Sequence, residues 1–553
     1  MSRRFADTFP DPSVIRGRDS YWYAYGTSDP LREGQTRRVL LPIARSRDLV
    51  TWTFVEAVFG TANHPRWATR TSSFWAPDIR YFDGSYHLYY VATDTTFTAD
   101  PFDRAIGVAT APTPAGPWTD SGAPVVGPRG APGERPLWAL DPAQFTDIDG
   151  TRYLFYGSYE GGVWVTRLRE DGLRAVGPHT RVAISDRYEA PFVVRRGPYY
   201  YLFVSSGNCC AGPTSGYSVF VGRATSVRGP FRDAQGVSLN ASRVGGSVVV
   251  TPNGNRWIGT GHGSIVTDLA GQTWLAYHAI DRRDPFLNEP FGINERPMLL
   301  DRLDWNDGWP TVRAGQWASE QPVVAPVTSP AATALFRPFA VPPPAPGTGR
   351  HDPRFGDEFA GAALDRQWRW VRSPDGDVHG GRFVWRTQVG NLVGAANTAS
   401  ALLRRMPTGP YTVETRLELD LGENTARDFQ QAGLIVYAGD DLFARLSQVA
   451  IGPTRQVEYG KEMPFAGRTS YGQILLGPPR STVWLRITHR TDPSNGEHEF
   501  QASMSRNGRR WLPGGVWTMP AETTPQVGLV SHGAAAGQRR ATVRFDYFRV
   551  YGP

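Results

Sequence analysis

Apolar and polar positions alternate along this chain in short stretches, and glycine or proline separates one stretch from the next. A turn residue followed by alternating aromatic residues recurs five times, and each copy has the form of a tight turn that leads into a half-buried strand. The copies lie at residues 19–26, 84–90, 150–157, 197–203 and 271–278. The pattern predicts sequential β-units with no helical periodicity between them.

A polar residue, in a short group with proline or glycine, stands before each of these strands. The groups are Asp11-Pro12, Pro77-Asp78, Asp141-Pro142, Glu189-Ala190-Pro191 and Gly261-His262-Gly263. A single Asp-Pro group is most simply a turn, but five groups in register indicate a shared position. Sequential units of about four strands are typical of a β-propeller, whose innermost strands converge on one axis. We therefore expect residues 1–320 to form a five-bladed β-propeller with these polar side chains in a central funnel.

The remainder of the chain has a different pattern. Residues 321–350 are rich in proline and alanine, which favours an extended, semi-rigid linker. Residues 351–553 return to alternating strands, which we expect at 411–419, 431–437, 442–449, 483–488 and 543–551. These strands suit a two-sheet antiparallel β-sandwich. The predicted fold class is therefore all-β, with a propeller followed by a sandwich.

Composition and charge exclude several classes of partner. Aromatic residues make up 12% of the chain, and 60 Gly and 46 Pro punctuate it, as many short strands and turns require. The net charge of +7 arises from interspersed residues, without the basic tract of a nucleic-acid binder. We expect no membrane span, since no apolar run of about eighteen residues occurs. Met1 to Thr8 lack a signal-peptide core, so a mature secreted form and an intracellular protein both stay open.

The two cysteines, Cys209 and Cys210, are adjacent, which rules out a disulfide framework. Neighbouring Cα atoms lie about 3.8 Å apart across a trans peptide, below the usual disulfide range of roughly 4.4 to 6.8 Å. A bond between them would close a strained ring that stiffens the loop. Two reduced thiols are an equally favoured alternative.

Carboxylates gathered at one end of a channel repel one another, and burial raises their pKa values further. Such a cluster is therefore explained better by metal binding or acid–base catalysis than by structure alone. Hydrolysis of a glycosidic bond needs one protonated carboxyl to donate to the leaving oxygen and one ionised carboxylate to activate water.

The segments around the acids resemble those of glycoside hydrolase family 43 in their residues, order and spacing. They are Phe9-Pro-Asp-Pro-Ser-Val-Ile15, Phe74-Trp-Ala-Pro-Asp-Ile79, Leu140-Asp-Pro142 and Glu189-Ala-Pro-Phe192. The resemblance covers residues 5 to 315 and implies an inverting reaction. It makes Asp11 the general base, Glu189 the general acid and Asp141 the residue that orients the acid and tunes its pKa. Inversion requires roughly 6.5 to 9.5 Å between the base and acid carboxyls.

Further residues are assigned by the same resemblance. His262 is similar to a histidine that faces an axial ion, usually calcium and commonly through water, with a purely structural role as the alternative. Trp75, Asp78 and Arg296 are the expected substrate-binding residues. Trp75 would offer an apolar platform to a sugar face or pack within the propeller. Arg296 would hydrogen-bond a furanose hydroxyl or pair with a carboxylate.

The resemblance is strongest to the arabinan-cleaving members of the family, in the loop 209–217 and around His262 and His278. It implies hydrolysis of α-L-arabinofuranosyl linkages in arabinan or arabino-oligosaccharides of the plant cell wall, outside the cell. No cofactor is required for the chemistry, and a structural Ca²⁺ at the axis is the one ion expected. A β-xylosidase or xylan-debranching arabinofuranosidase is the first alternative. A non-catalytic carbohydrate-binding propeller is the second, and the retention of all three acids argues against it.

The second half of the chain resembles the concanavalin-like, jelly-roll domains appended to some members of this family. The matching segments are Phe355-Gly-Asp-Glu-Phe359, Gln430–Tyr437 and Phe545–Val550. Such domains bind carbohydrate, contribute a residue to the catalytic pocket or stabilise the propeller. Of these roles we favour stabilisation.

Overall fold

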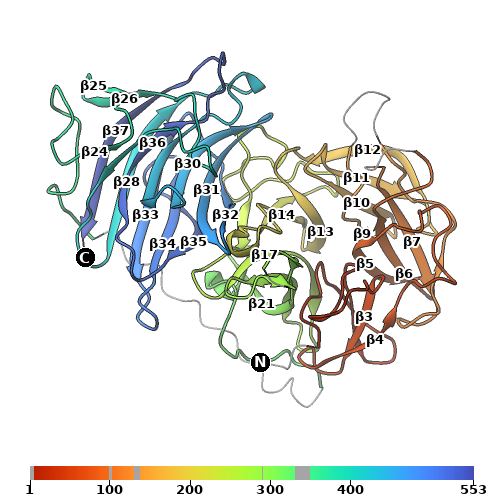
Figure 1. Ribbon diagram of the computed structural model, residues 1–553. Coiled ribbons are helices and arrows are strands. Elements are labelled where there is room, and N and C mark those ends of the chain that lie inside the picture. The colour runs from red at the N-terminus through yellow and green to blue at the C-terminus, as the bar shows by residue number, and fades with distance from the viewer. Residues whose placement is uncertain (1–4, 99–102, 130–136, 289, 330–348, 553) are drawn as a thin grey trace.

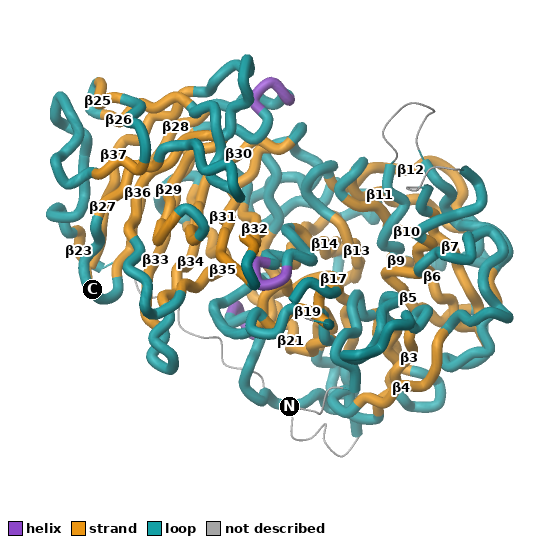
Figure 2. Tube along the Cα trace, viewed as in Figure 1, coloured by secondary structure: helices purple, strands orange, loops and turns teal. Residues whose placement is uncertain are grey.

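The computed structural model describes residues 5–98, 103–129, 137–288, 290–329 and 349–552 (Figure 1). Five four-stranded antiparallel sheets are arranged around an axis, and two larger sheets pack face to face beside them. Strands make up nearly all the regular structure, as Figure 2 shows. Within the described ranges, no helix is long and apolar enough to cross a bilayer. The chain is thus an all-β protein with a five-bladed propeller and a concanavalin-like sandwich, as predicted.

Each blade is a meander of four strands in chain order, with β19 and β20 inserted in the fifth. Blades one and two are β1 (Ser13–Arg16), β2 (Trp22–Tyr25), β3 (Pro42–Ser46) and β4 (Trp52–Ala57), then β5 (Phe74–Phe82), β6 (Ser85–Ala92), β7 (Ala105–Ala111) and β8 (Thr119–Asp120). Blade three is β9 (Ala143–Thr146), β10 (Arg152–Ser158), β11 (Gly162–Leu168) and β12 (Ala175–Ala183). Blades four and five are β13 (Glu189–Arg196), β14 (Tyr199–Ser206), β15 (Ser218–Ala224) and β16 (Ser247–Val250), then β17 (Trp257–Thr267), β18 (Thr273–Asp281), β21 (Met298–Asn306) and β22 (Trp309–Val312). The inserted pair is β19 (Phe286–Leu287) and β20 (Ile293–Asn294).

The aromatic repeats of the sequence form the second strand of each blade and pack between neighbouring blades. Tyr25 of blade one, for example, shares a buried cluster with Phe74 and Tyr90 of blade two. The ring closes in the same way, because Trp22 of blade one packs in a cluster with Trp274 of blade five. Burial of large aromatic side chains supplies much of the stability of such an interface.

The sandwich follows the predicted strands closely. One sheet has the order β24 (Arg369–Val371), β27 (Ala401–Arg404), β36 (Gln526–His532), β29 (Gln431–Gly439), β30 (Leu442–Ile451), β31 (Thr454–Phe465) and β32 (Arg468–Leu476). The other has the order β25 (Asp377–His379), β26 (Arg382–Arg386), β37 (Thr542–Gly552), β28 (Tyr411–Leu419), β33 (Thr482–Thr491), β34 (His498–Ser505) and β35 (Trp511–Met519), and β23 (Arg350–His351) pairs with β37. All five strands expected from the alternation pattern are therefore confirmed.

The two bodies are in direct contact. Ile258 and Ile280 of blade five belong to the same buried cluster as the core of the sandwich, and Arg282 of the propeller forms an ion pair with Glu497 of the sandwich. Most of the predicted linker at 321–350 lies outside the described residues. The described part of the linker, residues 321–329, contacts blade five, because the backbone N–H of Val327 donates a hydrogen bond to Asp268 Oδ2 at 2.9 Å.

Candidate active site

One residue of each innermost strand, or of the segment that leads into it, has an unusual backbone conformation. The residue at this point has a left-handed φ in every blade: 54° at Asp11, 48° at Ala76, 52° at Asp141, 53° at Ala190 and 43° at His262. Non-glycine residues rarely adopt this conformation, and aspartate tolerates it better than most. Such strain is stored where the surrounding fold holds a functional side chain in place.

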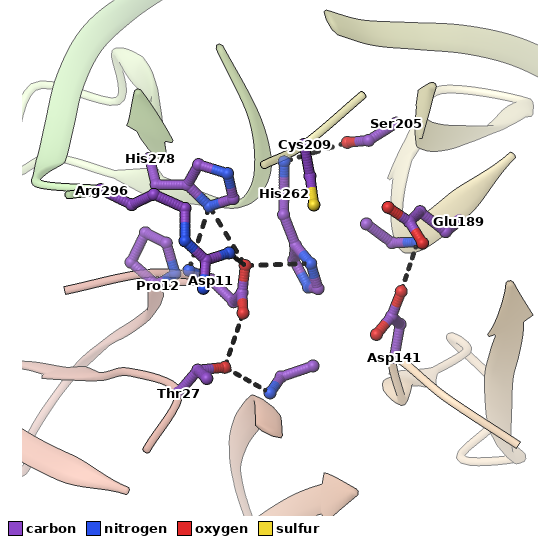
Figure 3. Close-up of polar contacts among 12 residues, drawn as sticks. Asp11, Pro12, Thr27, Asp141, Glu189, Ser205, Cys209, His262, His278 and Arg296 are labelled. Atoms are coloured by element: carbon purple, nitrogen blue, oxygen red, sulfur yellow. Dashed lines mark hydrogen bonds and ion pairs between the residues drawn. The ribbon is translucent and has the colours of Figure 1, made fainter. Parts of the chain in front are cut away.

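Asp11 is held from three sides by groups of blades one and five. Its Oδ1 lies 3.1 Å from His278 Nδ1, 3.3 Å from His262 Nδ1 and 3.4 Å from Arg296 Nη1. Thr27 Oγ1 donates to the other oxygen, Oδ2, at 2.6 Å. Figure 3 shows these groups gathered around the Asp11 carboxylate. Positive and hydrogen-bonding partners on both oxygens favour the ionised carboxylate.

Asp141 and Glu189 form a second group on the other side of His262 (Figure 3). Glu189 accepts hydrogen bonds from Tyr217 Oη at 2.6 Å and from Ser158 Oγ at 2.7 Å. Asp141 Oδ2 accepts the backbone N–H of Ala190, the residue after Glu189, at 3.0 Å. The negative charge of Asp11 acts on both carboxyls, so all three acids share one electrostatic environment.

The surroundings shift the pKa values of the three acids in different directions. Burial raises the pKa of Asp11, but the charges of His262 and Arg296 and the hydrogen bond to His278 outweigh it and hold that pKa well below the usual range. Burial, followed by the negative charge of Glu189, raises the pKa of Asp141 well above its usual range. Burial also raises the pKa of Glu189, against the opposing hydrogen bonds from Tyr217 and Ser158. One ionised and one protonated carboxyl are the pair that general acid–base hydrolysis requires.

Arg296 pairs with carboxylates, which was one of its two predicted alternatives. Its Nη1 lies 3.4 Å from Asp11 Oδ1, and its Nη2 lies 3.5 Å from Asp29 Oδ2. Burial raises the pKa of Asp29 to about 6, although the charge of Arg296 opposes the shift. Arg296 is therefore a link between two buried acids, and a contact to substrate stays a prediction.

Trp75 and Asp78 occupy different surroundings, although both come from the same strand. Trp75 is half-buried, and the guanidinium carbon of Arg104 lies 5.7 Å from its ring centroid. The charge of Arg104 also acts on Asp141, so Trp75 and Asp141 have Arg104 as a common neighbour.

Asp78 is bound by structural partners. Its carboxylate forms an ion pair with Arg80 at 2.8 Å and accepts the backbone N–H of Gln144 at 2.7 Å. Ala76 occupies the strand-start position in blade two, so Asp78 lies two residues further along the strand. The structure therefore does not bring Asp78 into the group formed by the other three acids, and its role in substrate binding stays a prediction.

His262 lies beside Asp11. The described residues around it do not form a cluster of side chains that would coordinate a metal ion directly. His262 Nδ1 faces Asp11 Oδ1 at 3.3 Å, and burial lowers the pKa of the ring although the charge of Asp11 opposes that shift. In the part of the chain that the structure describes, no three or more His, Cys, Asp or Glu side chains are grouped to hold a metal ion. The structural Ca²⁺ that the resemblance implies, contacted by His262 through water, stays a prediction, and the mechanism below uses no metal ion.

Sequence reasoning did not assign roles to several residues of the site. Thr27, Ser158 and Ser205 each lie where the second strand of a blade ends, and Glu189 pairs directly with Ser205 across blade four. Because the first two strands of a blade are antiparallel, the end of the second strand lies beside the start of the first. A hydroxyl residue within two residues of the end of an aromatic strand was therefore the signal for these positions.

The loop that follows blade four's second strand carries the two cysteines. The structure joins Cys209 and Cys210 in a disulfide, the first of the two alternatives left open by the sequence. The same loop leads through η1 (Gly212–Thr214) to Tyr217, whose ring stacks on His278 with centroids 5.7 Å apart. Tyr217 thus connects the group around Glu189 with the group around Asp11.

Comparison with known proteins agrees with this geometry. Residues 5–310 match the family model described as glycosyl hydrolases family 43. The chain belongs to glycoside hydrolase family 43. It is therefore a glycoside hydrolase of a family that inverts the anomeric centre and needs no cofactor for its chemistry. Residues 356–551 match a β-xylosidase C-terminal concanavalin A-like domain.

Individual relatives of this family 43 chain cover its first half. An extracellular exo-α-(1→5)-L-arabinofuranosidase of Cellvibrio japonicus is 34% identical, over 55% of this chain and 85% of the relative. An extracellular endo-α-(1→5)-L-arabinanase of Bacillus subtilis is 30% identical, over 54% of this chain and 86% of the relative. The solved Cellvibrio cellulosa α-L-arabinanase with arabinohexaose is 30% identical over 56% of this chain and 96% of that chain, with a TM-score of 0.46.

Proposed function

We propose that this enzyme hydrolyses α-L-arabinofuranosyl linkages in arabinan or arabino-oligosaccharides. Asp11 acts as the general base, Glu189 as the general acid, and Asp141 as the residue that orients and tunes the acid, supported by its hydrogen bond from the backbone N–H of Ala190. The observation that carries these roles is the opposite direction of the pKa shifts at Asp11 and Glu189. The names of the two relatives that cleave α-(1→5)-L-arabinosyl bonds support the substrate.

In the proposed reaction, ionised Asp11 takes a proton from a water molecule, whose oxygen attacks the anomeric carbon. Glu189 gives its proton to the leaving oxygen while the glycosidic bond breaks, so the product has the inverted configuration. His278, Arg296 and Thr27 hold the Asp11 carboxylate in place and ionised. Ser158 and Tyr217 fix the orientation of the Glu189 carboxyl.

The proposed substrate also implies where the enzyme acts. Arabinan is a polymer of the plant cell wall, and both relatives are named as extracellular. We therefore place this enzyme outside the cell, acting on plant polysaccharide or its fragments. The bounds 1–320, 321–350 and 351–553 are proposed as catalytic propeller, linker and accessory sandwich, with Trp75 at the rim of the substrate site.

A panel of substrates tests the proposed specificity. Linear arabinan, arabino-oligosaccharides, xylo-oligosaccharides and the aryl glycosides of both sugars would be compared at equal enzyme concentration. We expect the arabinosyl substrates to be cleaved with the higher kcat/KM. The sandwich matches a domain named for β-xylosidases, so a preference for the xylosyl substrates would favour that alternative and contradict the proposal.

Replacement of Glu189 by Gln tests the acid role directly. The amide keeps the shape of the carboxyl but has no proton to donate, so turnover of arabinan should fall by about 10²-fold or more. The exposed Glu170 gives a matched control, and Glu170→Gln should leave turnover unchanged. Near-wild-type turnover in Glu189→Gln would exclude Glu189 as the acid.

A further inference from the structure

The edge of the seven-stranded sheet of the sandwich lies against propeller segments close to Glu189, the proposed general acid. Strands β31 and β32 form the hairpin at that edge, and β32 is the last strand of the sheet. An open strand edge is normally protected from pairing with other chains. Here the propeller loop 207–217 lies against β32, and Figure 1 shows both strands beside blade four.

Gln456 of β31 forms hydrogen bonds with Asp186 and Arg187, which lie shortly before Glu189 in the chain. Its Oε1 accepts a hydrogen bond from Arg187 Nη1 at 3.0 Å, and its Nε2 donates to the backbone oxygen of Asp186 at 3.0 Å. Gln456 and Arg187 are both fully buried. Arg187 is also anchored by the backbone oxygen of Gly245 at 3.3 Å. Only Tyr188 separates this anchored segment from Glu189.

A second contact fixes the loop on the other side of the acid. The backbone N–H of Gln473 in β32 donates to Asn208 Oδ1 at 2.9 Å. Gly216 and Gly472 approach the opposite backbone so closely that neither position has room for a β-carbon. Tyr217 follows Gly216 directly and donates to Glu189 Oε1 at 2.6 Å. The sandwich thus contacts both segments that determine where the Glu189 carboxyl lies.

We propose that Gln456 is a positioning residue for the general acid, so that the sandwich takes part in proton donation without touching the substrate. This inference rests on the proposed role of Glu189. Proton transfer requires the acid within about 2.6–3.2 Å of the leaving oxygen, and a displacement of about 1 Å is enough to slow a reaction strongly. Loosening the Asp186–Arg187 segment should therefore weaken acid assistance more than substrate binding.

The test compares substrates that need the acid to different degrees. An arabino-oligosaccharide has a poor leaving group and needs the proton, whereas a 2,4-dinitrophenyl arabinofuranoside has a good one and does not. For Gln456→Ala we expect kcat to fall about 10-fold on the oligosaccharide and by less than about 3-fold on the aryl glycoside, with little change in KM. Both rates come from one preparation, so a loss of folded enzyme cancels in their ratio.

A second readout is the pH profile. Burial raises the pKa of Glu189, so water admitted by the variant should lower that pKa and move the alkaline limb to lower pH. The matched control is Glu497→Gln, which breaks the interdomain ion pair with Arg282 away from the acid. This control should change neither the rate ratio nor the alkaline limb.

Three outcomes separate this inference from the proposed function. Equal losses on both substrates in Gln456→Ala, or no loss, would overturn the positioning role. Glu189→Gln serves as the reference variant. If it lost the same factor in kcat on the oligosaccharide and on the aryl glycoside, the acid assignment would be overturned, and this inference with it. If the wild-type enzyme prefers xylosides, the arabinan proposal fails, and the same ratio measured with xylobiose and its aryl xyloside still tests Gln456.

Discussion

Asp11 is a buried carboxyl and Glu189 a half-buried one, and their neighbours leave their pKa values shifted in opposite directions. Two imidazoles and a guanidinium surround Asp11. Glu189 instead has two hydroxyl donors, and the negative charge of Asp11 raises its pKa further. Burial alone would raise both pKa values, so the difference between base and acid comes from the partners that each blade provides.

Removal of the Tyr217 hydroxyl should move the alkaline limb of the kcat/KM profile. This limb reports the loss of the proton from Glu189. The Tyr217 hydroxyl stabilises the ionised carboxylate and lowers its pKa, so Tyr217→Phe should shift the limb to higher pH. An unchanged limb, or a shift to lower pH, measured on an aryl glycoside, would contradict the assignment.

At the scale of the strand, the sequence revealed which segments reach the axis but not which side chain each one presents. Asp11 and Asp141 precede proline at the strand start and have the left-handed φ found there. In the second blade the same position is Ala76, and Asp78 pairs with Arg80 instead. A shift of one or two residues changes what a strand residue meets, and the Pro-Asp order alone does not show this offset.

Thr27 links the base to the next blade and provides a test at this scale. Its Oγ1 donates to Asp11 Oδ2 at 2.6 Å and accepts the backbone N–H of Ala76 at 2.8 Å. Thr27→Val would leave both partners buried without this bond, at a cost of about 1–3 kcal/mol in the free energy of unfolding, and should also reduce kcat. Thr27→Ser keeps the hydroxyl and should behave like wild type in urea denaturation and in the assay. Equal stability of the Val and Ser variants would contradict this role.

For the whole molecule, composition and alternation predicted two bodies and five of the sandwich strands. The contact between the bodies had no such signature, because Gln456 and Arg187 are far apart in the sequence and neither belongs to a motif. The same holds for Ile258 and Ile280, which complete the buried cluster of the sandwich from within blade five. Local patterns show which face of a strand is buried, but not which distant surface covers it.

A chain that ends after residue 329 should therefore be less stable than the full enzyme. It would expose Ile258 and Ile280, whose burial contributes roughly 1.5–3 kcal/mol each. We expect its melting temperature to fall by about 5 °C or more, together with a loss of turnover. Circular dichroism melts and the arabinan assay check both points. An isolated propeller with the stability and activity of the full chain would show that the sandwich is dispensable.

In the proposed reaction, Asp11 and Glu189 act on opposite sides of one arabinosyl bond. Proton NMR tests this by following the anomeric form of the first product while the enzyme cleaves arabinan or an aryl α-L-arabinofuranoside. We expect the β-anomer to appear first and the α-anomer only later by mutarotation. Initial release of the α-anomer, or no release of arabinose or its oligomers, would contradict the proposed reaction.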